Sequence, residues 1–131
     1  MNAFEQLTHY LKRIRGSLKR FDQQEKKMAL MHLTIIPLGT GSPSMGEYVA
    51  DIQKALEKSG RPYTLTDMGT TVEGPSKELL ALAAQLSEMP FSKGVHRVVT
   101  QISLDDRRDK GVELGDKIAS VADRLKHDNK G

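Results

Sequence analysis

A glycine-rich loop, Gly39-Thr40-Gly41-Ser42, is the first segment whose residue types could bind a ligand. It follows a β-forming run and precedes a segment with helical spacing, so its backbone N–H groups could bind an anion at the start of a helix. The loop has neither the lysine of a P-loop nor the complete spacing of a dinucleotide-binding loop. A simple connection between a strand and a helix is therefore the main alternative.

Glu73 is the second candidate, because it stands in a short β-forming run beside Gly69 and Thr70. A carboxylate that is buried there needs a partner, and a cationic or amino-bearing ligand would supply one. The alternative is a solvent-facing acid at the end of a strand.

The charged run Asp105-Asp106-Arg107-Arg108-Asp109-Lys110 is the third candidate. Its acids could bind a cation, whereas Arg107 and Arg108 could bind an anion or contact a second subunit. The alternative is a solvated turn whose charges pair with one another.

Catalytic and metal-binding patterns are not recognisable in the sequence. The four histidines, His9, His32, His96 and His127, are widely separated. His32 and His96 could stand near each other at the starts of neighbouring strands, but two histidines lack the third ligand of a zinc site. No residue pattern pairs a nucleophile with a base. We therefore expect no enzyme activity, no metal and no cofactor.

Four segments around these candidates are typical of β-strands, because they are rich in β-branched and aromatic residues. They are residues 32–38, 63–68, 70–73 and 95–104. Gly69 permits a tight turn, so the second and third segments are expected to form a hairpin.

Three further segments carry apolar residues at helical spacing. They are residues 44–59, 76–89 and 114–125. Ser44 and Glu47 have the spacing of a capping box at the start of the first helix, and Ser76 could cap the second. Gly60 and Pro90 are expected to end these two helices.

The resulting order β-α-β-β-α-β-α predicts an α+β fold of the ferredoxin-like type, βαββαβ, followed by a C-terminal helix. Right-handed crossovers place the first two helices on one face of a four-stranded antiparallel sheet. Alternation along the strands places Ile36, Thr71 and Val99 on the other face. A second copy of the chain could cover that face, so we expect a homo-oligomer.

The first 27 residues have a different character from the rest of the chain. Their apolar residues repeat every three or four positions and predict an amphipathic helix. These are Phe4, Leu7, Leu11, Ile14, Leu18 and Phe21. We interpret residues 1–27 as a helical extension of a domain formed by residues 28–131. The extension could pack on the domain or on a second subunit, remain flexible, or lie on a membrane surface.

Charge and composition narrow the range of functions. The chain of 131 residues has a net charge of +3, and residues 1–27 hold seven bases against three acids, which leaves residues 28–131 at −1. A basic face is therefore not predicted for the domain, and we expect no nucleic-acid partner.

Cysteine is absent and aromatic residues are only 5%, so the core must be aliphatic. No segment has the continuous apolar run of a signal peptide or a membrane span, and we expect a cytoplasmic protein.

Five segments taken together resemble the thiamine-binding protein family. They are Ile36-Pro37-Leu38-Gly39-Thr40-Gly41, Tyr48-Val49, Met68-Gly69-Thr70-Thr71-Val72-Glu73-Gly74, Arg97-Val98-Val99-Thr100, and the charged run described above. The resemblance runs from about residue 33 to about residue 125. It implies a ferredoxin-like fold, a homotetramer built from dimers, and binding of thiamine or its hydroxymethyl-pyrimidine portion without known catalysis.

The resemblance also makes the polar groups in these segments stronger candidates for ligand contacts, because thiamine carries a positive thiazolium ring, an aminopyrimidine and a hydroxyl. Glu73 could accept from the amino group or offset the ring charge, and we expect Glu73→Gln to weaken thiamine binding. Arg107 and Arg108 suit a phosphate or a subunit contact. The remaining predicted ligand-binding residues are Gly39, Thr40, Ser42, Tyr48, Met68, Gly69, Thr70 and Thr100.

The sequence thus predicts a non-enzymatic binding protein for thiamine or a related pyrimidine, acting as a carrier, buffer or sensor. One alternative is a protein-interaction or regulatory module with a vestigial pocket. The other is an enzyme of small-molecule metabolism that uses Glu73 or an aspartate of the charged run as its acid.

Overall fold

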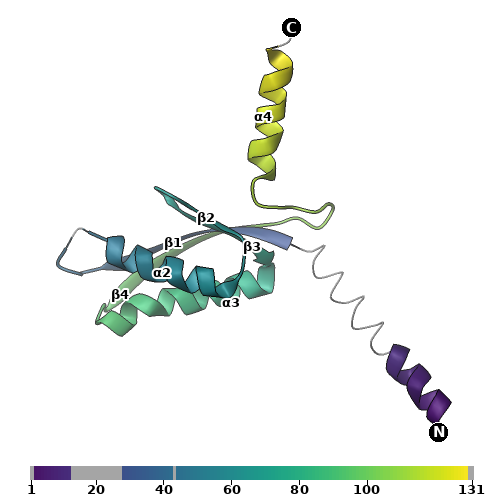
Figure 1. Cartoon of the computed structure of the whole chain (residues 1–131). Coiled ribbons are helices and arrows are strands. Elements are labelled where there is room, and N and C mark those ends of the chain that lie inside the picture. The colour runs from purple at the N-terminus through teal and green to yellow at the C-terminus, as the bar shows by residue number, and fades with distance from the viewer. Residues whose placement is uncertain (1, 13–27, 43, 130–131) are drawn as a thin grey trace.

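The computed structural model describes residues 2–12, 28–42 and 44–129. Residues 3–12 are helical. The elements that follow are β1 (Met28–Leu38), α2 (Gly46–Ser59), β2 (Tyr63–Thr66), β3 (Gly69–Pro75), α3 (Ser76–Glu88), the 3-10 helix η1 (Met89–Lys93), β4 (Arg97–Asp106) and α4 (Asp116–Asp128). This order confirms the ferredoxin-like α+β fold with its C-terminal helix (Figure 1).

The sheet is antiparallel and has the strand order β2-β3-β1-β4, so β1 lies between β3 and β4. Alternate residues of β1 are buried because a strand turns successive side chains to opposite faces. The buried ones are Ala29, Met31, Leu33, Ile35 and Pro37. The first four form the centre of an aliphatic core.

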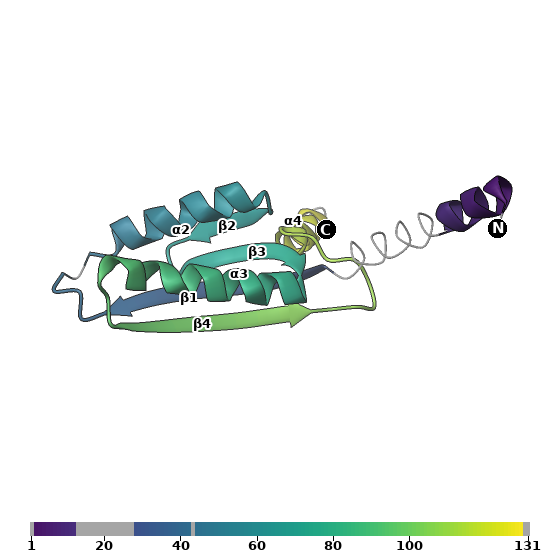
Figure 2. The same cartoon turned by 90° about the horizontal axis from the view of Figure 1, so that it is seen from below.

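Helices α2 and α3 lie side by side on one face of the sheet (Figure 1 and Figure 2). Each buries its apolar stripe against β1 and β3, and this burial stabilises the helices more than their intrinsic propensity does. The buried helical residues are Ile52, Leu56, Leu79, Ala83 and Leu86.

The opposite face of the sheet is open. Thr71 pairs with His32, and Ile36 pairs with Val99; Thr71, His32 and Ile36 lie between the buried positions of β3 and β1. The prediction that Ile36, Thr71 and Val99 share the face without α2 and α3 is therefore confirmed.

Both predicted N-terminal caps are wrong. Helix α2 begins at Gly46 with Met45 as its N-cap, and Ser44 instead donates its backbone N–H to the Oγ of Ser42. Ser76 is already inside α3, because β3 runs in extended conformation through Pro75 directly into the helix. Side-chain caps are absent from both of these helix starts, which lie in the described part of the chain.

The strand limits also differ from the predicted ones. β2 ends at Thr66 and β4 begins at Arg97, each two residues inside its predicted limit, whereas other strand ends extend further. β1 begins at Met28, four residues earlier than predicted, because Met28 and Ala29 pair with Pro75 and Gly74 of β3. At the other edge of β1, Ala29 pairs with Asp106, so β4 includes the start of the charged run.

The two terminal helices differ from α2 and α3. The apolar side chains of residues 3–12 are exposed, and the predicted continuation through Ile14, Leu18 and Phe21 lies outside the described residues. α4 buries none of its residues and extends from the sheet on the side opposite α2 and α3 (Figure 1). In the parts of the chain with described structure, no helix is long and apolar enough to cross a membrane.

Candidate functional site

A cavity of 340 Å³ lies between α2, β1 and the turn of the β2–β3 hairpin. It exists because β1 pairs with β3 only as far as Leu33, whereas its pairing with β4 continues to Leu38. The end of β1 is therefore unpaired on the side of the hairpin, and α2 crosses above this gap. The lining residues are Leu33, Thr34, Ile35, Ile36, Met45, Val49, Ile52, Gln53, Leu65, Thr66, Asp67, Met68, Gly69 and Thr70.

The polar centre of this cavity is a pair of side chains from α2 and β3. Gln53 Nε2 donates to Thr70 Oγ1 over 3.2 Å, and Thr70 is only 5% exposed. The bond leaves the amide oxygen of Gln53 as an acceptor and the hydroxyl proton of Thr70 as a donor. Because most of the surrounding wall is aliphatic, these two atoms can orient a ligand that buries its remaining surface.

Asp67 supplies the charge at this cavity. Among the described residues that line it, Asp67 is the one with an ionisable side chain. It stands in the hairpin turn next to Met68, which is 80% exposed. A cationic ligand could therefore place its apolar part beside α2 and its charge near the turn.

Gly69 is required for the close approach of the hairpin to β1. Its φ is +154°, and a Cβ at this position would lie 2.6 Å from His32 Nε2 and 2.9 Å from the carbonyl oxygen of Leu33. A larger residue would push the hairpin away from the edge of β1. Gly69 therefore shapes the cavity that Thr70 lines.

The predicted ligand-binding residues do not form one cluster. Met68, Gly69 and Thr70 line the cavity. Glu73 lies on the open face, because it is three positions from Thr70 along a strand. Its Oε2 accepts from the backbone N–H of Leu114 over 3.1 Å, so the partner of Glu73 in the fold is the segment that leads to α4.

Thr100 and Tyr48 contact other parts of the helical layer. Thr100 lies 2.8 Å from the hydroxyl of Ser87 and so connects β4 to α3. The ring of Tyr48 is 5.4 Å from Lys93 Nζ of η1. Lys93 also pairs with Asp51, and this hydrogen bond lowers the pKa of the Asp51 carboxyl.

The glycine loop does not reach the cavity. Thr40 donates its hydroxyl to the carbonyl of Ser42 over 2.7 Å, and the same hydroxyl accepts from the N–H of Ser42. Gly39 and Gly41 adopt φ values of 71° and 75°, which favour glycine. Within the described residues, the loop forms a local turn between β1 and α2.

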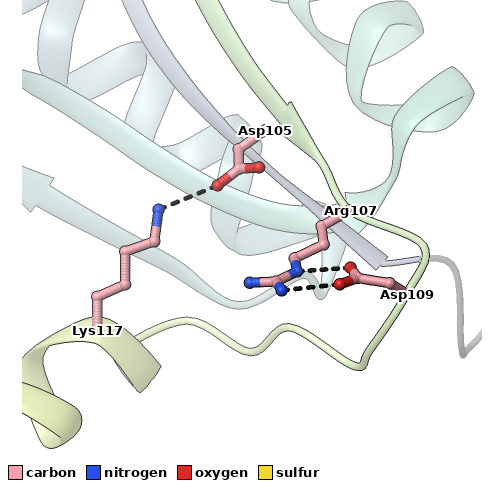
Figure 3. Close-up of polar contacts among 4 residues, drawn as sticks. All are labelled: Asp105, Arg107, Asp109 and Lys117. Atoms are coloured by element: carbon pink, nitrogen blue, oxygen red, sulfur yellow. Dashed lines mark hydrogen bonds and ion pairs between the residues drawn. The ribbon is translucent and has the colours of Figure 1, made fainter.

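The arginines of the charged run pair with their neighbours. Arg107 donates two hydrogen bonds to Asp109, and this pairing lowers the pKa of Asp109 to about 2 (Figure 3). Arg108 donates to both carboxylate oxygens of Asp106. The alternative of an internally paired run is correct for these two side chains.

The predicted neighbourhood of His32 and His96 is wrong. His32 stands in the middle of β1 opposite Ser103, whereas His96 precedes Arg97, which pairs with Leu38 at the other end of the strand. No group of three His, Cys, Asp or Glu side chains that could hold a metal occurs among the residues with described structure.

Four polar residues of the cavity are absent from the predicted set: Thr34, Thr66, Gln53 and Asp67. The sequence signals of the last two are weak. Gln53 follows Val49 by one helical turn and faces the sheet together with it. Asp67 immediately precedes the motif that starts at Met68, in a turn where an aspartate is common. Both residues gain significance only when α2 and the hairpin are placed against β1.

The fold and the cavity define a small ferredoxin-like domain with a ligand-sized, mostly apolar pocket at the edge of β1. The family model described as "thiamine-binding protein" matches residues 31–122. The chain belongs to this family.

Curated relatives support the assignment. The UPF0045 protein YqgV of Bacillus subtilis is 49% identical over 102 residues, which cover 75% of this chain and 98% of the relative. A UPF0045 protein of Methanothermobacter thermautotrophicus is 38% identical, and the match covers 75% of this chain and all of the relative.

Solved structures agree with the fold. A hypothetical protein of Methanocaldococcus jannaschii superposes with a TM-score of 0.67 at 27% identity, covering 73% of this chain and 97% of that one. A Thermotoga maritima protein described as a putative thiamine biosynthesis/salvage protein gives a TM-score of 0.61 at 18% identity, covering 72% and 98%.

Proposed function

We propose that this chain binds thiamine or its hydroxymethyl-pyrimidine portion without converting it, as a carrier, buffer or sensor. The supporting observation is the cavity under α2, which combines a buried Gln53–Thr70 pair with an aliphatic wall and a carboxylate at its rim. Membership of the thiamine-binding protein family gives the ligand class. The volume of 340 Å³ lies within the usual range for small-molecule sites.

The polar groups of the cavity match the two halves of thiamine. The amide oxygen of Gln53 can accept from the pyrimidine amino group, and the hydroxyl of Thr70 can donate to a ring nitrogen. Asp67 can offset the positive thiazolium charge at the more exposed end. The pyrimidine fragment alone should therefore retain most of the binding, because the buried groups contact that half.

Titration calorimetry of thiamine with the variants Thr70→Val and Thr71→Val tests this site. Loss of the buried hydroxyl should weaken binding roughly tenfold, because a broken buried hydrogen bond costs ~1–3 kcal/mol. Thr71 is the matched control, since it makes the same isosteric change on the opposite face of the sheet. Equal effects of the two variants, or no saturable binding by the unmodified chain, would exclude this site.

The choice between Asp67 and Glu73 as the carboxylate near the ligand has its own test. Asp67→Asn should weaken thiamine binding about two- to fivefold, the range of an exposed charge pair of ~0.2–1 kcal/mol. Glu73→Gln should leave affinity unchanged, because Glu73 faces Leu114 on the other side of the sheet. The opposite ranking would restore the role that the sequence predicts for Glu73.

The absence of catalysis is part of the proposal. Incubation of the protein with thiamine or its pyrimidine fragment should leave the ligand unchanged by mass spectrometry. Appearance of a product that depends on the protein would move the assignment to an enzyme of small-molecule metabolism.

We also propose a homo-oligomer, with a dimer of dimers as the expected form and the cytoplasm as the expected location. Support comes from the open sheet face and from the exposed stripe of α4, formed by Ile118, Val121 and Leu125. Light scattering should give a mass that is a multiple of 14.6 kDa. A monomer at micromolar concentration would contradict the proposed oligomer. The ligand-binding proposal would then still depend on the calorimetric tests above.

The same exposed apolar residues favour one second candidate, a protein-interaction module with a vestigial pocket. Leu7 and Leu11 of the helical residues 3–12 are each more than half exposed, as is Val121 of α4. A chain without residues 1–27 distinguishes the candidates. Unchanged thiamine affinity supports the pocket, whereas failure of both chains to bind thiamine supports the interaction module.

A further inference from the structure

A second hollow lies at the other end of β1, where the end of β4, the loop after it and the first turns of α4 meet. Its volume is 420 Å³. This hollow is separate from the cavity under α2. The cavity borders the half of β1 from Leu33 onward, whereas the hollow lies at the opposite end of β1, where Leu30 pairs with Asp105. The lining residues are Asp105, Arg107, Lys110, Gly111, Val112, Asp116, Lys117, Ser120, Val121 and Arg124.

The hollow carries an excess of positive charge. Four of its lining side chains are cationic and two are carboxylates, in a domain whose net charge is otherwise slightly negative. Asp109 lies outside the lining and pairs with Arg107, which reduces the local excess to one positive charge. The hollow therefore favours an anion, and a phosphoryl group has enough oxygens to contact several of the separate cations at once.

Two of the cations retain unused donors. Arg107 donates through Nε and Nη2 to Asp109, so Nη1 remains available, and Lys117 contacts Asp105 through one 3.0 Å bond. Figure 3 shows the side chains of Arg107, just after the end of β4, and of Lys117, on α4, in the space between the strand end and the helix. Their acidic partners hold both side chains in place beside the hollow.

The other two cations are less constrained, although Lys110 is near enough to Asp109 to help lower the pKa of its carboxyl. Lys110 and Arg124 form no hydrogen bond or salt bridge with any of residues 2–12, 28–42 and 44–129. One lies in the loop after β4 and the other on the third turn of α4, and both border the hollow. Ser120 of α4 adds a neutral hydroxyl to the lining. An anion in this space would bridge the loop and the helix.

We propose that this hollow binds the phosphoryl groups of a small molecule, as free pyrophosphate or as an organic diphosphate. Lys110 and Arg124 are the principal contacts, and Arg107 and Lys117 supply additional donors. A bound anion would fix α4 against the end of the sheet, because the two principal contacts come from both sides. The site does not depend on thiamine binding under α2.

Calorimetry with inorganic pyrophosphate at about pH 7 and about 0.05 M salt is the direct test. Lys110→Gln combined with Arg124→Gln should lower affinity roughly tenfold or more, because two charge-assisted contacts are lost. Lys126→Gln is the matched control, since this exposed lysine on α4 does not line the hollow. Asp105→Asn should raise affinity, because it removes a carboxylate from the hollow and releases Lys117.

Each outcome decides the proposal. Saturable binding that is lost in the double variant, kept in Lys126→Gln and strengthened by Asp105→Asn supports it. No binding by the unmodified chain, equal loss in the control, or no loss in the double variant overturns it. A nucleoside diphosphate, which has no thiamine portion, distinguishes the source: tighter binding than pyrophosphate indicates an organic diphosphate. Thiamine titrations of the double variant should be normal, so this site and the cavity under α2 can fail independently.

Discussion

Helices α3 and α4 have the same length and similar patterns but opposite surroundings. α3 buries Leu79, Ala83 and Leu86 against the sheet, whereas α4 leaves Ile118, Val121 and Leu125 more than half exposed. An amphipathic pattern thus specifies a helix and the face that will pack, but not the surface on which it packs. The partner of α3 is in the same chain, and the stripe of α4 is available to another surface.

The largest expected effect is the loss of stability when the buried stripe is shortened. Leu86→Ala should lower the free energy of unfolding by ~2–5 kcal/mol, because it leaves a cavity in the core. Val121→Ala is the counterpart on α4 and should cost less than ~0.5 kcal/mol in the isolated chain. Thermal unfolding followed by circular dichroism should show a melting temperature roughly 10 °C lower for Leu86→Ala. Similar shifts for both variants would mean that α4 is packed in solution.

A backbone position at the start of β3, beside β1, gives the second effect. Gly69→Ala should cost ~1–3 kcal/mol, since its Cβ would collide with His32 and with the backbone of Leu33 in a disfavoured conformation. Gly111→Ala, in the loop that leads to α4, meets nothing within 4 Å. Chemical denaturation of the two variants measures the difference. A small effect at Gly69 would show that the hairpin can move relative to β1, and the cavity under α2 with it.

A charge in the exposed stripe of α4 should weaken subunit association more than it lowers the folding stability of the single chain. Ile118→Asp should weaken subunit association roughly tenfold or more, because one buried Ile side chain contributes ~1.5–3 kcal/mol. Ala119→Asp introduces the same charge about 100° around the helix and serves as the control. Light scattering over a range of protein concentrations is the measurement. An unchanged mass for Ile118→Asp would leave the stripe without a role in assembly.

The difference between the two helices also explains what the sequence could and could not predict. The strands, α2, α3 and the position of Thr71 on the open face depend on local periodicity, and all were predictable. The cavity was not, because it needs Gln53 from α2 and Asp67 from the hairpin to meet at β1. The predicted grouping of Thr70 with Glu73 overlooked the alternation of strand side chains, which separates residues three apart. Leu114, the actual partner of Glu73, follows it by 41 residues, and no local pattern indicates that contact.

The smallest effect concerns the charged run that joins β4 to α4. Arg107 lowers the pKa of Asp109 from its ordinary 3.8 to about 2 through their hydrogen bonds. Because the folded pKa lies below the unfolded one, the pair stabilises the fold above about pH 4, and this contribution is lost as the pH falls toward 2. Asp109→Asn should therefore lower the melting temperature by a few degrees at most near neutral pH, since both side chains are exposed.

The same comparison at low pH sharpens the test of this pair. The melting temperatures of Asp109→Asn and the unmodified chain should converge as Asp109 becomes protonated near pH 2. Asp128→Asn, at the exposed end of α4, removes the same charge without removing a hydrogen bond to an arginine and should give no such convergence. A difference for Asp109→Asn that persists unchanged to low pH would mean that the ionised carboxylate of Asp109 is not the source of the stabilisation.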